Sequence, residues 1–138
     1  MHDLPRQLTV DELAALFSGR SRFVDKLAQE DDPLGRARVI ARELSEEEKI
    51  EALATHPRIG ERSPEQYGDD PVVLVELATL NQVYEEKFGF RFVVFVAGRP
   101  RDEILPVLRE RIARTREEEL ETGLDELVSI AEARWRAS

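Results

Sequence analysis

Apolar residues recur every three or four positions along most of the chain, with charged residues between them. This spacing is typical of helices that bury one face. In three places a Ser or Thr precedes such a stretch and a Glu follows three positions later, as in the capping box that begins a helix. These pairs begin at Thr9, Ser45 and Thr115, and Pro33 and Pro71 begin two further stretches. The pattern therefore predicts a series of helices.

Glycine or proline marks several of the predicted helix ends. Gly19 and Gly89 directly follow apolar stretches, and Pro57 cannot continue the helix that begins after Ser45. Pro106 lies inside another stretch, which we expect it to kink. About seven helices result: one after Thr9, one around Phe23–Leu27, one from Pro33, one after Ser45, one over Pro71–Phe88, one over Arg101–Ala113 and a long one after Thr115.

Two segments do not fit the helical pattern. Residues 90–98, FRFVVFVAG, are too short and too rich in β-branched and aromatic residues for a helix, and we expect them to be buried and extended. Residues 56–71 are rich in turn formers and should be irregular, apart from one helical turn at Ser63 and Pro64. One extended segment among about seven helices predicts an all-α helical bundle. The length fits a single domain over residues 1–138.

The composition excludes several kinds of chemistry. The chain has no cysteine, which rules out disulfides, a thiolate nucleophile and cysteine-ligated metal sites. Its two histidines, His2 and His56, are too few for a histidine-rich metal centre. We therefore expect no metal site built on cysteine or on several histidines.

The charge balance argues against nucleic acid as a partner. Twenty basic residues against 29 acidic ones give a formal net charge of −9, which repels phosphate. The longest purely apolar stretch, Phe92–Ala97, is too short to cross a membrane, and neither terminus resembles a targeting signal. We expect a cytoplasmic protein that binds neither nucleic acid nor membrane.

The charge runs EEKF and REEELE should be solvated helix faces, and the Leu and Phe stripes should form the core.

His56 is the first residue that could carry chemistry. It precedes Pro57, which holds it extended just beyond a helix end. An imidazole, with an unperturbed pKa of about 6.5, suits proton transfer at neutral pH. If the neutral form is the active one, the rate should fall below about pH 6.5. A helix-terminal histidine that interacts with the last carbonyls is the structural alternative, and position alone favours it.

Two further features could be functional or structural. Glu65 and Gln66 stand at an expected helix start, where an acidic residue also simply stabilises a helix. Arg134 follows Leu127 by seven residues and should share its core-facing side of the last helix. A guanidinium there needs either an internal acid or an anionic ligand as its partner.

Taken in order, four motifs resemble the family of 2-oxo-4-hydroxy-4-carboxy-5-ureidoimidazoline (OHCU) decarboxylases. The motifs are HPRIG (56–60), the EQ pair (65–66), LNQVYEEKFGFRF (80–92) and IAEAR (130–134). The resemblance covers residues 50 to the C-terminus. It implies a helical bundle that forms a homodimer and decarboxylates the ureidoimidazoline to (S)-allantoin during urate breakdown, without a cofactor.

The resemblance also implies roles for individual residues. The catalytic pair falls on His56 and Glu65. The residues expected to bind the ureidoimidazoline substrate, in part through their backbone groups, are Pro57, Arg62, Ser63, Gln66, Phe92, Val93, Val94, Val96 and Arg134.

Two positions and the length of one loop depart from the family pattern. Arg62 occupies the place of a common serine, although Ser63 is adjacent; the loop between HPRIG and EQ is short; and Arg114 replaces an asparagine before the last helix. Changes at the rim of the site leave a related acid–base activity on another ureide or a hydantoin as one alternative. A catalytically inactive helical interaction module is the other, and the intact His56, Glu65, Gln66 and Arg134 argue against it.

Overall fold

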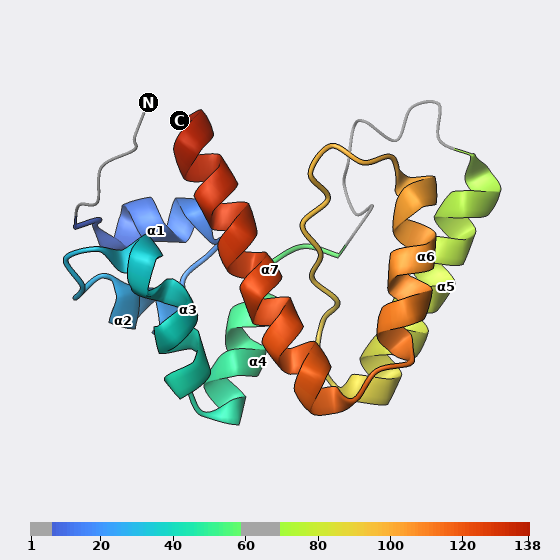
Figure 1. Cartoon of the computed structure of the whole chain (residues 1–138), viewed down its shortest axis with the longest axis horizontal. Coiled ribbons are helices and arrows are strands. Elements are labelled where there is room, and N and C mark those ends of the chain that lie inside the picture. The colour runs from blue at the N-terminus through green and yellow to red at the C-terminus, as the bar shows by residue number, and fades with distance from the viewer. Residues whose placement is uncertain (1–6, 59–69) are drawn as a thin grey trace.

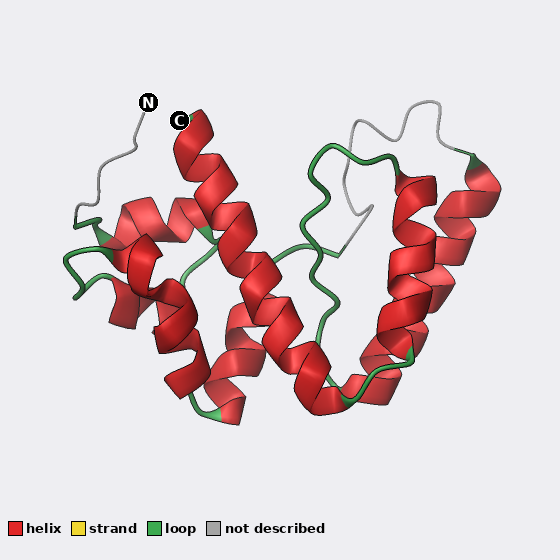
Figure 2. Cartoon of the chain, viewed as in Figure 1, coloured by secondary structure: helices red, strands yellow, loops and turns green. Residues whose placement is uncertain are grey.

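The structure is a computed structural model that describes residues 7–58 and 70–138. These two ranges contain seven helices (Figures 1 and 2). No strand occurs within these ranges, so the all-α prediction is confirmed. The helices are α1 (Val10–Leu16), α2 (Arg22–Leu27), α3 (Pro33–Glu43), α4 (Glu46–Ala54), α5 (Pro71–Phe88), α6 (Arg101–Ile112) and α7 (Arg116–Ala137).

All three predicted capping boxes are present. At the first of them, the Thr9 hydroxyl accepts the Glu12 N–H at 3.1 Å and the Glu12 carboxylate accepts the Thr9 N–H at 3.0 Å. Ser45 and Thr115 make the same reciprocal pairs. Each box satisfies two backbone groups that a helix start leaves unpaired, which is why these helices begin where the sequence indicates.

Glycine ends α5, as its position in the sequence predicts. Gly89 has a φ of 81°, a left-handed conformation that side chains disfavour, and its N–H donates to the carbonyl of Glu85. Pro106 lies within α6, which continues to Ile112.

The helices form two groups joined by α7. Helices α1 to α4 pack against one another and against α7, whereas α5 packs on α6 (Figure 1). Residues 91–96 run extended between α7 and the α5–α6 pair, as predicted for this segment. The side chains of Phe92, Val93 and Val94 are buried there.

A cluster of aromatic rings attaches this extended segment to α5. The ring centroid of Tyr84 lies 4.7 Å from that of Phe88, 6.0 Å from that of Phe90 and 5.1 Å from that of Phe92. Contacts of this kind between buried rings stabilise a core beyond the area they bury. The segment is therefore anchored to α5 by its side chains, and its backbone is left to make other contacts.

One part of the REEELE run is not solvated, contrary to our expectation. Glu119 is fully buried, and its carboxylate accepts hydrogen bonds from Arg111 and from the Tyr84 hydroxyl, each at 2.7 Å, and from Arg114 at 2.9 Å. Because Glu119 lies one turn into α7, on its inward face, it meets the end of α6. Burial and the bond to Glu119 raise the pKa of Tyr84 above its usual value, so the hydroxyl stays protonated as a donor.

None of the described helices is both long and apolar enough to cross a membrane.

Candidate active site

His56 lies just beyond the end of α4, as its place before Pro57 predicts. Its N–H donates to the carbonyl of Leu53 at 3.3 Å, and the imidazole is half-buried. Thr55 fastens the same turn, because its hydroxyl lies 2.8 Å from the carbonyl oxygen of Ala52 and 3.1 Å from that of Phe17. The imidazole is therefore carried by a turn whose backbone is held against both α4 and the residue that follows α1.

The surroundings of His56 favour its neutral form. Burial lowers the pKa of the imidazole from 6.5 to about 4, and the positive charges of Arg134 and Arg91 act in the same direction. Its Nδ1 atom is buried and has no hydrogen-bond partner among the described residues. A neutral imidazole at physiological pH can accept a proton, which is what a general base requires.

Arg91, which the sequence analysis did not single out, holds the backbone at His56. Its Nη1 atom donates to the carbonyl of Ala54 at 2.9 Å and to that of His56 at 2.7 Å. The feature of the sequence that could have pointed to Arg91 is that it is the one charged residue in the apolar run FRFVVFV.

Arg134 projects from the last turn of α7 toward the turn that follows α1. Its Nη1 atom donates to the carbonyl of Leu16 at 2.8 Å and to the Ser18 hydroxyl at 2.7 Å, and Ser18 has an unusual φ of 68°. Burial lowers the pKa of the guanidinium, but an arginine remains charged.

The side chain of Arg134 is exposed, so the expectation that it faces the core is wrong. Its guanidinium is partly buried where it reaches the carbonyl of Leu16, so Arg134 lies at the edge of the core rather than within it. Within the described parts of the chain, no carboxylate pairs with Arg134, and neutral oxygens hold it.

Charged side chains fix the backbone of residues 92–96. Arg111 donates to the carbonyl of Val93 at 2.7 Å, and Glu126 accepts the N–H of Phe95 at 3.2 Å. Arg99 donates to the carbonyls of Phe95, at 2.7 Å, and Val96, at 3.0 Å.

Some backbone groups of the same segment have no such partner. No hydrogen bond between described residues engages the N–H groups of Val94 and Val96 or the carbonyl of Val94. Groups of this kind can bind a planar ligand that carries both donors and acceptors.

The structure describes some of the predicted site residues and not others. Arg62, Ser63, Glu65 and Gln66 lie outside the described residues. Pro57 is exposed beside His56. The structure brings His56 and Arg134 to the same end of α1: Thr55, next to His56, contacts the carbonyl of Phe17, and Arg134 donates to that of Leu16. In the described parts of the chain, no three acidic or histidine side chains are grouped so that they could hold a metal ion.

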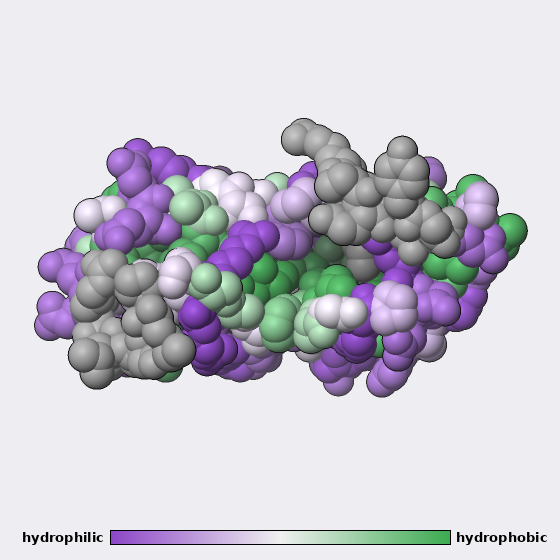
Figure 3. Space-filling model, turned by 90° about the horizontal axis from the view of Figure 1, so that it is seen from above, coloured by the Kyte–Doolittle hydropathy of each residue, from purple (hydrophilic) through white to green (hydrophobic). Residues whose placement is uncertain are grey.

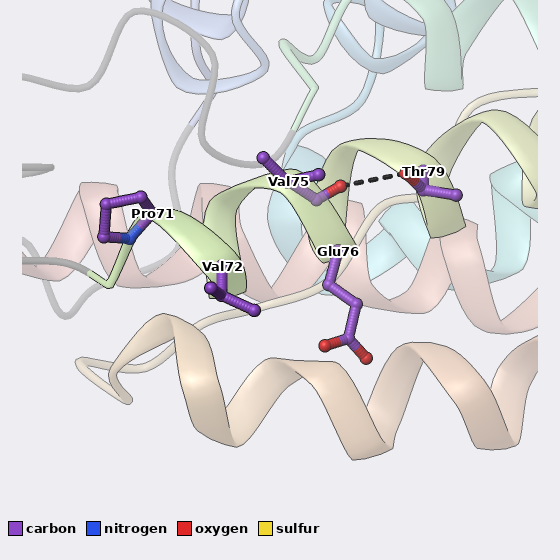
Figure 4. A pocket seen from close by; sticks show the side chains of 5 residues that line it. All are labelled: Pro71, Val72, Val75, Glu76 and Thr79. Atoms are coloured by element: carbon purple, nitrogen blue, oxygen red, sulfur yellow. Dashed lines mark hydrogen bonds between the residues drawn. The ribbon is translucent and has the colours of Figure 1, made fainter.

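An apolar hollow that His56 does not line lies along the first half of α5. It measures about 410 Å³, the described residues that line it all belong to α5, and the Thr79 hydroxyl donates to the Val75 carbonyl within it (Figure 4). The lining residues are Pro71, Val72, Val75, Glu76 and Thr79. Glu76 also pairs with Arg109 of α6. A lining of this kind suits an apolar surface rather than a small anion.

Comparison with known proteins gives a consistent result. The family model for OHCU decarboxylase matches residues 3–136. The 2-oxo-4-hydroxy-4-carboxy-5-ureidoimidazoline decarboxylases of Halalkalicoccus jeotgali and Haloferax volcanii are each 31% identical over 104 residues, which cover 67% of this chain. The match covers 59% and 62% of those two proteins, so the chain spans about three-fifths of the length of these relatives.

Solved structures agree with the family model. The crystal structure of an OHCU decarboxylase in the presence of (S)-allantoin superposes with a TM-score of 0.78 at 29% identity, and covers 91% of this chain and 96% of that one. An (S)-allantoin synthase of 20% identity shares the fold, with a TM-score of 0.72. This chain belongs to the OHCU decarboxylase family.

Proposed function

We propose that the protein decarboxylates 2-oxo-4-hydroxy-4-carboxy-5-ureidoimidazoline to (S)-allantoin in the breakdown of urate, as one domain that works in the cytoplasm. The observation that carries this proposal is the match to the OHCU decarboxylase solved with (S)-allantoin, because it extends over nearly the full length of both chains. The half-buried, neutral histidine and the nearby arginine support it from this chain's own residues.

The substrate itself contains the group that accepts the electron pair of the breaking C–C bond. Its carboxylate lies on a ring carbon next to a C=N bond. When CO₂ leaves, the electron pair of the broken bond forms a C=C bond to the imine carbon, and the imine electrons move onto its nitrogen, which takes up a proton. The hydroxyl of the resulting enol then loses its proton and becomes a carbonyl, and the neighbouring ring carbon, which bears the ureido group, takes up a proton. The protein's own tasks are therefore to orient the ring, to move protons and to deliver the last proton to one face.

In this proposal His56 and Glu65 are the two groups that move protons. The lowered pKa of His56 supports its part, since a neutral imidazole is available as a base throughout the physiological range. A proton-transfer residue of this type typically contributes about 10²–10⁴-fold to the rate.

Arg134 and the extended segment are proposed to hold the substrate. Among the described residues, hydrogen bonds engage only the Nη1 atom of Arg134, so its remaining N–H groups can bind a carboxylate or a ureido oxygen. Gln66 and the backbone of Phe92–Val96 complete the proposed site, with Pro57, Arg62 and Ser63 at its rim. Holding a substrate in its reactive geometry lowers the activation barrier by roughly several kcal/mol, as linking two reactants within one molecule does.

A direct assay tests this function. The substrate is generated freshly from urate by enzymatic oxidation and hydrolysis, and its disappearance is followed with and without the protein. We expect clear acceleration that survives treatment with a chelator, and loss of that acceleration in His56→Asn. Acceleration on a hydantoin but not on this substrate would favour the related acid–base activity, and no activity on either would favour an interaction module.

A homodimer is also part of the proposal, with α5 as the interface. Val72 and Val75 are 68% and 66% exposed, and Val83 follows on the same helix at 42%. Seen from above, apolar surface is exposed at the end of the molecule that α5 forms (Figure 3). Exposed apolar patches mark interaction surfaces, and a two-fold dimer would cover the same stripe on both copies.

A further inference from the structure

We propose that Arg91 is a positioning residue for His56, which fixes the backbone that carries the imidazole and supplies a positive charge beside it. The kinetic consequence of this inference rests on the proposed function, but the placement and charge of Arg91 do not.

The geometry of the contact is specific. A single nitrogen atom of Arg91 donates to two carbonyls, those of Ala54 and His56, at 2.9 and 2.7 Å. Ala54 is the last residue of α4, and the carbonyls at a helix end lack partners within the helix. Hydrogen bonds from a charged donor are stronger than those between neutral groups. Arg91 therefore closes the end of α4 and holds His56 in the same contact.

The turn is held on its other side as well. Thr55, between the two carbonyls, makes contacts with the carbonyls of Phe17 and Ala52 through its hydroxyl. Pro57 restricts the backbone of His56 to an extended conformation. The backbone that carries the imidazole is thus held from two sides, by Arg91 and by Thr55.

Arg91 also links the two halves of the proposed site. It directly precedes Phe92, the first residue of the segment proposed to bind substrate, and Arg111 fixes that segment two residues further on, at Val93. Arg91 thus connects the backbone of His56 directly to this segment.

The charge of Arg91 has a second effect. Among the described residues, the charged groups that act on the imidazole are Arg134 of α7 and Arg91, and both disfavour a second proton on the ring. Burial is the larger cause of the lowered pKa, so loss of Arg91 should raise the pKa of His56 without restoring its usual value.

NMR titration of His56 tests this inference without an activity assay. The chain has two histidines, and a His2→Gln variant identifies the imidazole signals of His56. In Arg91→Met we expect the titration midpoint of His56 to rise by about 0.5 pH unit or more. In Arg91→Lys, which keeps the charge, the midpoint should stay near that of the wild type. If Arg91→Met does not fold, Arg91→Gln, which is also uncharged but can still donate to a carbonyl, replaces it.

Kinetics of the same variants test the positioning role. We expect kcat/KM to fall at least tenfold in Arg91→Met and to recover in part in Arg91→Lys. Arg116→Met is the matched control, because Arg116 donates in the same way to the carbonyl of Phe88 at the end of α5, at 2.9 Å. Arg116→Met should leave both the His56 midpoint and kcat/KM near the wild-type values.

Two results would overturn the inference. One is a His56 midpoint that does not change in Arg91→Met or in its substitute, Arg91→Gln. The other is an equal loss of kcat/KM in the Arg91 and Arg116 variants. A wild-type protein without decarboxylase activity would instead contradict the proposed function, and the NMR titration would still decide whether Arg91 acts on His56.

Discussion

The half-buried position of His56 changes the pH dependence expected of the reaction. From the sequence alone, activity should fall below about pH 6.5, the usual pKa of histidine. In the structure the pKa is lowered to about 4, so the neutral form persists as the pH falls through 6 and 5. We expect kcat/KM to stay level from pH 8 to about pH 5 and to decline toward pH 4. A measured decline centred between pH 6 and 7 would show that burial and the two arginines do not act on His56 as described.

Arg134 should affect catalysis far more than stability. Its contacts are neutral oxygens of Leu16 and Ser18, so Arg134→Met leaves no buried carboxylate without a partner. We expect the free energy of unfolding to change by about 1 kcal/mol or less, while kcat/KM falls at least tenfold. Arg134→Lys should not restore full activity, because an ammonium cannot bind a planar group with two parallel hydrogen bonds.

Urea unfolding curves give the free energy of unfolding of both Arg134 variants, and steady-state kinetics give their kcat/KM. A large loss of stability together with near-normal turnover of the folded protein would mean that Arg134 is structural.

The sequence marked Arg134 through its motif, IAEAR, but its position relative to the core could not be predicted. The place where a core ends depends on how α1 and α7 pack, and helical periodicity does not contain that information.

Among the helices, the contact between α6 and α7 depends on a buried ion pair. Glu119 is fully buried and Arg111 is nearly so, with their charged atoms 2.7 Å apart. Glu119→Gln removes the negative charge and leaves Arg111 buried without a counter-ion, which typically costs about 3–5 kcal/mol.

Glu118 offers a control on the same helix. Its side chain completes the capping box with Thr115 at the exposed start of α7, so Glu118→Gln should cost no more than about 1 kcal/mol. The free energies of unfolding in urea at pH 7 compare the two variants. Equal losses would show that the buried pair contributes no more than the exposed cap.

The helices themselves could be predicted better than the contacts between them. The capping boxes at Thr9, Ser45 and Thr115 are local patterns, so the sequence places those three helix starts correctly. Glu119 was expected to be solvated because it belongs to an acidic run. Its partner Arg111 lies eight residues away, across a helix boundary, and no period of a single helix relates the two residues.

At the scale of the whole molecule, the exposed stripe on α5 should control association. Val75→Glu places a charge in the middle of the stripe, and we expect the protein to shift from dimer to monomer in sedimentation or light-scattering measurements. Val39→Glu is a suitable control, since Val39 is 44% exposed on α3, away from the stripe. A wild-type monomer, or a Val75→Glu protein that is still dimeric, would contradict the proposed interface.

The proposed site combines parts that are distant in the sequence. His56 follows α4, Arg91 follows α5, Arg134 lies in the last turn of α7, and Ser18 follows α1. The motifs identified His56 and Arg134, because each belongs to a recognisable run of residues. They did not give a role to Arg91, although it lies within the motif at 80–92, or to Ser18, because the roles of these two residues depend on the packing of separate helices.

The handedness of the product tests the central claim most directly. Once CO₂ has left, the ring carbon that bears the ureido group is trigonal, and water alone protonates both of its faces equally, which yields allantoin without net circular dichroism. With the protein present, we expect freshly generated substrate to give a circular dichroism signal of (S)-allantoin that grows with protein concentration and disappears in His56→Asn. Racemic allantoin at every protein concentration would contradict the account.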